Sequence, residues 1–457
     1  MVLEKIPYDY ISTIPEQQPI PVGFYESDIA TGTRTPSVLV IPPINTNITI
    51  SQLPKFDPKV HARMMLAQKT KDIPEKHKDN FNWMTDKRDD QPSSITKQVT
   101  KVGNQYACGC CWAFSCSDAV SDSFVINQKT SENPECSFTY AMSCYPNCKD
   151  FSNPSTCTGN ESSKYPYSYQ CNGGAIAPLL MWISENGIAS HKCQNADWCS
   201  KRRECVMGTV DTTSLNYFVP SCGCKQNSSQ KLYYISTPIS KGISDDNPSS
   251  SEIQQHVNLI KNWIYNYGTV VTGFFVYSNL MSGKFYSQEK NPDGIYLEDV
   301  DYNSFQLFDN QINNFQGGHA VCIVGWGIGQ VANSLISDRS LRNTKNTHTR
   351  VPYWITRNSW TTQWGNNGLF HMAMYPFNKV AQFDKYVVVN TPQGRGEAGG
   401  QILFMPQKIE SKTISKESFT YNSQESSHSY IIWIFMILAV LFFLILIFVS
   451  YRIYRKK

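Results

Sequence analysis

The sequence predicts an α+β fold followed by one membrane-spanning helix, and three patterns carry this prediction. Apolar residues recur at helical spacing in residues 111–127, where Ala113, Val120 and Phe124 fall on one face. From Tyr267 onward the chain changes to apolar runs of strand type. Residues 431–449 then form nineteen consecutive apolar positions without a charge.

The elements between these patterns follow from local signals. Leu179, Leu180 and Ile183 predict a short helix over 175–185, and the Asn-Gly pair after it is a typical helix end. Helical periodicity returns over 252–267. We expect a strand at 267–278 and another directly after His319, each flanked by glycine.

A nucleophile site is predicted where the first helix begins. Cys111 opens that helix, and the partial positive charge of a helix N-terminus lowers the pKa of a thiol, whose thiolate form attacks carbonyl groups. Gln105 lies six residues upstream, so its side-chain amide can converge with the Cys111 backbone N–H. Two such donors would form an oxyanion hole for an acyl-transfer intermediate. The alternative is that Cys111 is a buried or disulfide-bonded cysteine.

The run Gln105 to Ser115 resembles the active-site segment of the papain family of cysteine proteases, which reads Gln-Gly-x-Cys-Gly-x-Cys-Trp-Ala-Phe-Ser. In that resemblance Cys111 is the nucleophile, Gln105 is the oxyanion-hole glutamine and Cys108 is a disulfide cysteine. Tyr106 replaces a glycine and Cys110 replaces a small residue, which crowds the loop.

Two later segments resemble the same family and follow in its chain order. The glycine turn and apolar strand around His319 are similar to its histidine segment, and the run from Tyr353 to Trp360 is similar to its asparagine segment. The resemblance makes His319 the base, which takes the thiol proton and forms an ion pair before substrate arrives. It makes Asn358 the residue that orients the imidazole and Trp360 the shield of that hydrogen bond. A lone histidine on an apolar strand would more often be a core residue.

The resemblance also implies a fold and a cleft. It implies a papain-like fold of two subdomains, a helical half that carries Cys111 and a β-barrel-like half that carries His319 and Asn358, with the cleft between them. Gly173 and Gly174 resemble the glycine segment along that cleft, where a side chain would block pairing with a substrate strand. The family joins the cysteines that match Cys108 and Cys171. The substrate expected is therefore a polypeptide.

The segment 267–278 and the run Gly317-Gly318-His319 resemble the cathepsin B branch of the family most. That branch owes its carboxy-dipeptidase action to a loop with paired histidines. Only His191 lies near the matching insertion, so we expect endopeptidase action. One alternative is an inactive papain-like module with a structural or binding role in a membrane or virion. Another is a different acyl-transfer enzyme, such as a peptide ligase or a cell-wall amidase.

Composition limits the partners and cofactors. The 457 residues carry a net charge of only +4, and no basic stripe is present, so nucleic acid is not an expected partner. Fifteen cysteines are too many for an ordinary reduced cytosolic enzyme and indicate disulfides. The clusters at 144–157 and 193–224 could instead bind zinc, but their spacing does not match zinc sites, and we expect neither metal nor cofactor. The oligomeric state does not follow from the sequence.

These observations divide the chain into an N-terminal extension or pro-segment, a peptidase domain, an extension with a stalk, a transmembrane helix and a basic tail. Their expected limits are 1–78, 79–374, 375–429, 430–451 and 452–457. Polar insertions are expected at 190–250 and at 329–350, the second as an exposed loop on the cleft side that could gate substrate.

The apolar run at 431–449 spans about 29 Å as a helix, close to the hydrocarbon thickness of a bilayer. We expect a single-pass protein anchored near its C-terminus in a host or virion membrane. The absence of an apolar run after Met1 favours a cytosolic protease domain, whereas the basic tail and the cysteines favour the opposite orientation. A membrane-anchored protein of a large DNA virus, oxidised during virion assembly, reconciles these signals.

Overall fold

The computed structural model describes residues 71–105, 108–148, 157–158, 168, 171, 173–195, 222–224, 228–308, 315–391 and 394–414. The described residues all belong to one compact unit. The predicted transmembrane helix at 431–449, the stalk and the N-terminal extension up to residue 70 lie outside the described residues. Among the residues that are described, no helix is both long and apolar enough to cross a bilayer.

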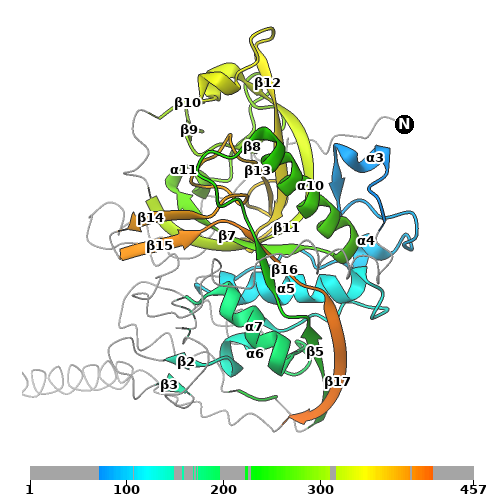
Figure 1. The fold of residues 1–457 in the computed structure, drawn as a ribbon. Helices are drawn as coiled ribbons and strands as arrows, with labels where there is room; N and C mark the ends of the chain where they lie inside the picture. The colour runs from blue at the N-terminus through cyan, green and yellow to red at the C-terminus, as the bar shows by residue number, and fades with distance from the viewer. Residues whose placement is uncertain are drawn as a thin grey trace, which may run out of the picture. The chain divides into compact units, whose positions relative to one another are not determined.

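The helices come mainly from the first half of the chain and the strands mainly from the second, as the α+β prediction requires (Figure 1). The helices are α3 Glu75–Lys78, α4 Ile95–Gln98, α5 Cys111–Ile126, α6 Phe138–Cys144, α7 Ile176–Asn186, α10 Ser250–Tyr267 and α11 Ser278–Met281, with 3-10 turns at Asn333–Leu335 and Arg339–Leu341. The strands are β1 Phe81–Asn82, β2 Asn147–Cys148, β3 Cys157–Thr158, β4 Ile188–Ala189, β5 Ser228–Ile235, β6 Ile239–Lys241, β7 Val270–Tyr277, β8 Ile295–Tyr296, β9 Val300–Asp301, β10 Gln306–Leu307, β11 Phe315–Ala332, β12 His348–Arg357, β13 Leu369–Ala373, β14 Val387–Thr391, β15 Gly394–Ala398, β16 Gln401–Leu403 and β17 Pro406–Ile414.

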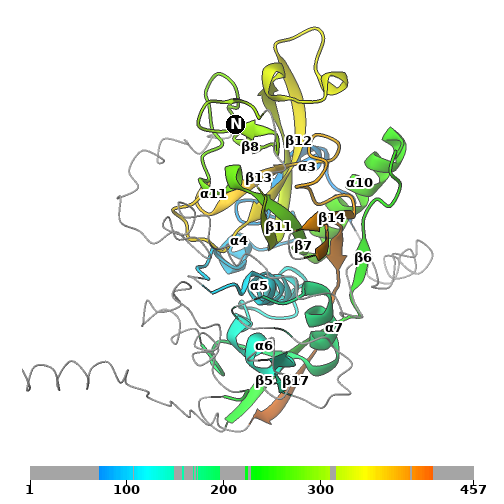
Figure 2. The ribbon, with the colours of Figure 1, turned by 90° about the vertical axis from the view of Figure 1, so that its left-hand side faces the viewer.

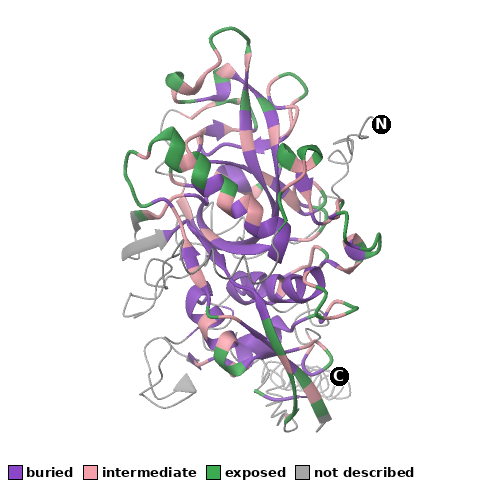
Figure 3. Cartoon of the chain, turned by 45° about the vertical axis from the view of Figure 1, so that its right-hand side comes forward, coloured by how far each residue is buried: buried purple, intermediate pink, exposed green. Residues whose placement is uncertain are grey.

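Helix α5 is the central helix of the helical half, with α6 and α7 beside it (Figure 2). Fifteen of its sixteen residues are buried (Figure 3), so the rest of the fold covers this helix on all sides. The helix predicted over 111–127 forms over Cys111–Ile126. Helices α7 and α10 also form where the sequence predicts them, and Gly187 ends α7 with a φ of 73°.

An eight-stranded sheet forms the strand-rich half, and its long strand β11 pairs antiparallel with β7 on one side and with β12 on the other. The strands follow one another in the order β6, β16, β7, β11, β12, β13 and β8, with β1 paired to β11. Phe81 and Trp83 are completely buried, and Phe81 lies opposite Trp326 of β11. The sheet thus places His319 near the start of β11 and Asn358 just past the end of β12.

Two sequence expectations about insertions differ from the structure. The polar segment at 329–350 is not one loop, because residues 329–332 and 348–350 extend β11 and β12 and pair with each other. Its tip lies thirteen residues beyond His319 along β11, which is about 40 Å of strand, so it does not border the site. Of the paired residues, Gln330 and Arg350 are exposed, whereas Val331, Ala332 and Thr349 are buried.

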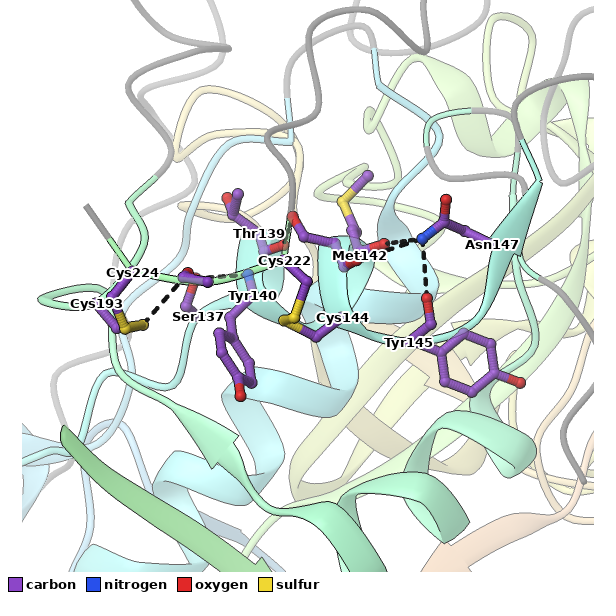
Figure 4. Close-up of a disulfide and its surroundings, with 12 residues drawn as sticks. Ser137, Thr139, Tyr140, Met142, Cys144, Tyr145, Asn147, Cys193, Cys222 and Cys224 are labelled. Carbon is purple, nitrogen blue, oxygen red and sulfur yellow. Dashed lines mark hydrogen bonds between the residues drawn. A yellow bond between two sulfur atoms is a disulfide. The ribbon is translucent and has the colours of Figure 1, made fainter. Parts of the chain in front are cut away.

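The cysteine-rich stretch 136–171 contains helix α6 (Figure 4). Ser137 caps it by accepting a bond of 3.0 Å from the Tyr140 N–H. Disulfides join Cys144 to Cys222 and Cys193 to Cys224 in the same region. The expected insertion at 190–250 likewise contributes β5 and β6 to two sheets.

The boundary expected near residue 374 does not divide the structure. Strand β16 pairs with β7 inside the main sheet, and Ile402 and Leu403 are completely buried. Strand β17 then pairs with β5 along its whole length. Residues 375–414 therefore belong to the same folded unit as the predicted peptidase domain.

Candidate active site

Cys111 is the first residue of α5, directly after the N-cap residue Cys110. It takes part in no disulfide, and only 3% of its surface is exposed. The free N–H groups and the dipole of a sixteen-residue helix point at this position, which favours negative charge on sulfur. The backbone N–H of Ala320, in β11, also lowers the pKa of this thiol and favours the thiolate.

That interaction places the nucleophile candidate beside the base candidate, because Ala320 follows His319 directly in β11. One turn further along α5, the Cys322 thiol donates a bond of 3.0 Å to the Ser115 carbonyl. Helix α5 therefore runs along β11 with Cys111 level with Ala320 and Ser115 level with Cys322. Two segments separated by more than two hundred positions of sequence meet in this way.

His319 and Asn358 form a direct hydrogen bond. His319 Nε2 lies 2.8 Å from Asn358 Oδ1, and both side chains are buried. Because an amide oxygen only accepts, Nε2 carries the proton and Nδ1 is left as the nitrogen that can accept one from a thiol. The Trp360 ring lies against the imidazole, with the two centroids 4.7 Å apart and the planes tilted by 31°.

Gln105 is held by both sides of the site. Its backbone N–H donates to the Ser359 carbonyl at 2.9 Å, and its Oε1 accepts a bond from the Ser359 hydroxyl. Its Nε2 donates one hydrogen to the Cys108 carbonyl at 2.9 Å, so a second amide hydrogen remains for an oxyanion. Sequence reasoning did not find the role of Ser359 in fixing this amide.

Burial dominates the electrostatics of the pair. It raises the pKa of the Cys111 thiol to about 11, although N–H groups of Ala320 and of the helix start act in the opposite direction. Burial also lowers the pKa of His319 to about 4, against the bond to Asn358. Both shifts favour the neutral thiol and the neutral imidazole, so burial opposes the preformed ion pair that the sequence predicts.

The glycine segment has a packing role that the sequence does not reveal. A Cβ on Gly174 would lie 2.5 Å from two atoms of the Trp112 indole, so this residue must be small for Trp112 to pack beside Cys111. Gly173 has a φ of 117°, which favours glycine. Just before these residues, a disulfide joins Cys171 to Cys108, and the Gly109 N–H donates to the Cys171 carbonyl at 2.7 Å.

A buried ion cluster lies behind the site and was missed by sequence reasoning. Arg357, which precedes Asn358, contacts Asp122 at 2.9 Å and Asp118 at 3.5 Å. The available signal was the spacing of the two aspartates, four residues apart on one face of an otherwise uncharged helix.

No group of metal-ligating side chains gathers within the described part of the chain. Four cysteines of the two clusters that could have bound zinc are instead joined in the disulfides 144–222 and 193–224.

The comparisons with known proteins agree on a family. The family model described as papain family cysteine protease matches residues 84–389. Probable cysteine proteinase 224L of Invertebrate iridescent virus 6 is 34% identical over 344 residues, which cover 72% of this chain and 67% of that protein. A cathepsin B-like cysteine proteinase of Schistosoma japonicum is 25% identical over 288 residues, covering 61% of this chain and 64% of that protein.

A solved structure of procathepsin B S9 from Trypanosoma congolense covers 78% of this chain and 84% of its own, with 19% identity and a TM-score of 0.42. The chain spans 60% to 67% of the length of its three iridescent-virus relatives. The family match covers the segments that carry Cys111, His319 and Asn358. This chain belongs to the papain family of cysteine proteases.

Proposed function

We propose that this chain is a thiol endopeptidase that hydrolyses peptide bonds through Cys111, His319 and Asn358. The observation that carries the proposal is the 2.8 Å bond from His319 Nε2 to Asn358 Oδ1, which leaves Nδ1 for the thiol of Cys111 at the helix start. A substrate that enters the site would supply the polar surroundings that the buried ion pair lacks.

In the proposed reaction, His319 Nδ1 takes the thiol proton and the sulfur attacks the peptide carbonyl carbon. The remaining amide hydrogen of Gln105 stabilises the oxyanion of the tetrahedral intermediate. As the intermediate collapses, the C–N bond breaks, and the imidazolium gives its proton to the leaving amine. Water then hydrolyses the thioester, with His319 acting as base, and restores the thiol.

An epoxide-type cysteine probe tests the nucleophile. We expect the full chain to be labelled at Cys111 and the Cys111→Ala variant not to be labelled. Cys110→Ala is the matched control, because this neighbouring thiol is also buried and its pKa is raised well above its ordinary value. Labelling that survives in Cys111→Ala, or none at any pH between 4 and 8, would favour the inactive binding module.

Endopeptidase action is tested separately from exopeptidase action. His191 is the single histidine near the expected insertion, and its ring packs edge-on against Phe138, with the centroids 5.8 Å apart. The insertion therefore does not match the paired-histidine loop of the cathepsin B branch, which favours internal cleavage. We expect cleavage inside an internally quenched peptide that is blocked at both ends. Release of C-terminal dipeptides with no internal cleavage would contradict this part of the proposal, and peptide-bond formation in excess of hydrolysis would point to a ligase.

We also propose that residues 431–449 anchor the chain in a host or virion membrane, because this apolar run matches the thickness of a bilayer. The full chain should stay with membranes after alkaline carbonate washing, and a variant with a polar linker in place of 431–449 should be released. Release of the unmodified chain would contradict the anchor.

A further inference from the structure

The buried cluster around Arg357 joins the two elements that carry the site. Arg357 ends β12, and its side chain is only 1% exposed. Its guanidinium contacts Asp122 Oδ2 at 2.9 Å, Asp118 Oδ2 at 3.5 Å and the Thr100 carbonyl, to which Nη1 donates at 2.8 Å. Both aspartates belong to α5, the helix that begins with Cys111.

The cluster is the third of three contacts between α5 and the central sheet. Cys111 lies level with Ala320, Ser115 accepts from Cys322, and the two aspartates hold Arg357. Cys322 and Arg357 are direct neighbours across β11 and β12, so the last two contacts sit side by side in the sheet. These contacts therefore fix the position of α5 along the sheet, and they involve residues that are close in sequence to His319 and Asn358.

A network of this kind holds its groups in one place. Asp122 is fully buried and also accepts bonds from the Thr100 N–H at 2.7 Å and the Thr269 hydroxyl at 3.0 Å. A buried carboxylate that lost one of these partners would keep an uncompensated charge, so small displacements of α5 are strongly opposed. The other titratable groups that act on the cluster are Lys101, Cys136 and Cys322.

We propose that Arg357 is a positioning residue: through its buried contacts with Asp118 and Asp122, it fixes the position of helix α5, and so of Cys111, relative to His319 and Asn358. The inference rests on the proposed function. It assigns no contact with substrate to Arg357. Sliding of α5 by a fraction of an ångström would separate the sulfur from the imidazole without unfolding the chain.

The test measures alkylation of Cys111 by iodoacetamide against pH, because this rate follows the thiolate and does not require peptide hydrolysis. Cys111→Ala identifies the signal by peptide mass spectrometry. Arg357→Lys keeps the charge and loses the planar fork that reaches several acceptors. Arg350→Lys is the matched control, since it makes the same change earlier in β12, where Arg350 forms an exposed ion pair with Asp79.

We expect the acid limb of the Arg357→Lys profile to move up by about one pH unit, so that alkylation on that limb is about tenfold slower than in the wild type. The Arg350→Lys profile should match the wild type. Peptide turnover should lose kcat and keep KM in Arg357→Lys. If that variant does not fold, Asp118→Asn gives the same measurement, with a smaller shift in the same direction.

Failure of the inference and failure of the proposed function look different. A wild-type limb well below the ordinary thiol range, superimposed on the limb of Arg357→Lys or of Asp118→Asn, would overturn the positioning role and leave the protease proposal standing. A wild-type profile with the midpoint of an ordinary thiol, about 8.5, would show that the sulfur and the imidazole are not coupled in the free chain, and it would overturn the positioning role. Absence of any hydrolysis of an internally quenched peptide by the wild type would overturn the proposed function.

Discussion

Replacement of Gly174 by alanine should disturb the site through Trp112. The added Cβ would lie 2.5 Å from Cδ2 and Cε2 of the indole, whereas ordinary contact begins near 3.4 Å. Trp112 is completely buried, so the ring has no solvent to move into and must shift by about 0.9 Å with its own backbone. Cys111 is the preceding residue, and it would shift with that backbone.

The magnitude follows from the two consequences of the shift. Overpacking of this kind costs roughly 1 to 3 kcal/mol, which we expect to lower the melting temperature by roughly 2 to 8 °C. A displacement of the nucleophile by nearly 1 Å costs on the order of a hundredfold in kcat/KM. Thermal unfolding monitored by near-ultraviolet circular dichroism gives the first quantity, and hydrolysis of an internally quenched peptide gives the second.

Gly273→Ala is the control, since a Cβ at this position of β7 would meet only the His319 carbonyl oxygen at 3.6 Å and Ile176 Cδ1 at 3.8 Å, both ordinary contacts. Wild-type stability and activity in Gly174→Ala would refute the packing argument. An unchanged melting temperature with a raised KM alone would instead support the sequence interpretation, in which a side chain at Gly174 blocks the substrate strand.

Three further predictions concern the site and its surroundings. Asn358→Ala should lower kcat on the order of a hundredfold and leave KM nearly unchanged, because the imidazole loses the partner at 2.8 Å that orients it. An equal loss of epoxide-probe labelling and of peptide turnover would support this explanation. Loss of the Cys108–Cys171 disulfide in a double serine variant should cost about 4 kcal/mol, from the 63-residue separation that the bond closes, in denaturant unfolding. Burial raises the pKa of Glu298 from 4.5 to about 7, so the folded state keeps this proton to a higher pH than the unfolded state and the free energy of unfolding should fall as pH rises from about 4.5 to 7. Glu298→Gln should flatten that pH dependence in unfolding curves. An unchanged slope in the variant would contradict the assignment.

Local chemistry was enough to find the candidate site. Cys111, His319 and Asn358 each stand in a short run of glycine, aromatic and apolar residues whose order resembles one family. The helices that begin at Cys111, Ile176 and Ser250 were also visible, because their apolar spacing and their ends are written in adjacent residues. These features depend on neighbours within one or two turns of chain.

The features that sequence reasoning missed depend on segments that are distant in sequence. No local pattern pairs Cys144 with Cys222, or carries β16 back into the sheet beside β7, because partners are chosen by packing once the chain has folded. The requirement for a small residue at Gly174 comes from an indole that reaches it from another segment.

The charge state of the site also depends on segments that are distant in sequence. The resemblance to the family placed a thiol and an imidazole in one site, and the family's chemistry implied an ion pair. The structure adds the burial that raises the pKa of one group and lowers that of the other. It also adds Arg357, whose two carboxylate partners sit on a helix more than two hundred residues earlier. The sequence thus determined which groups can react, and only the tertiary structure decided their solvation and spacing, because both are set by what the rest of the chain packs around them.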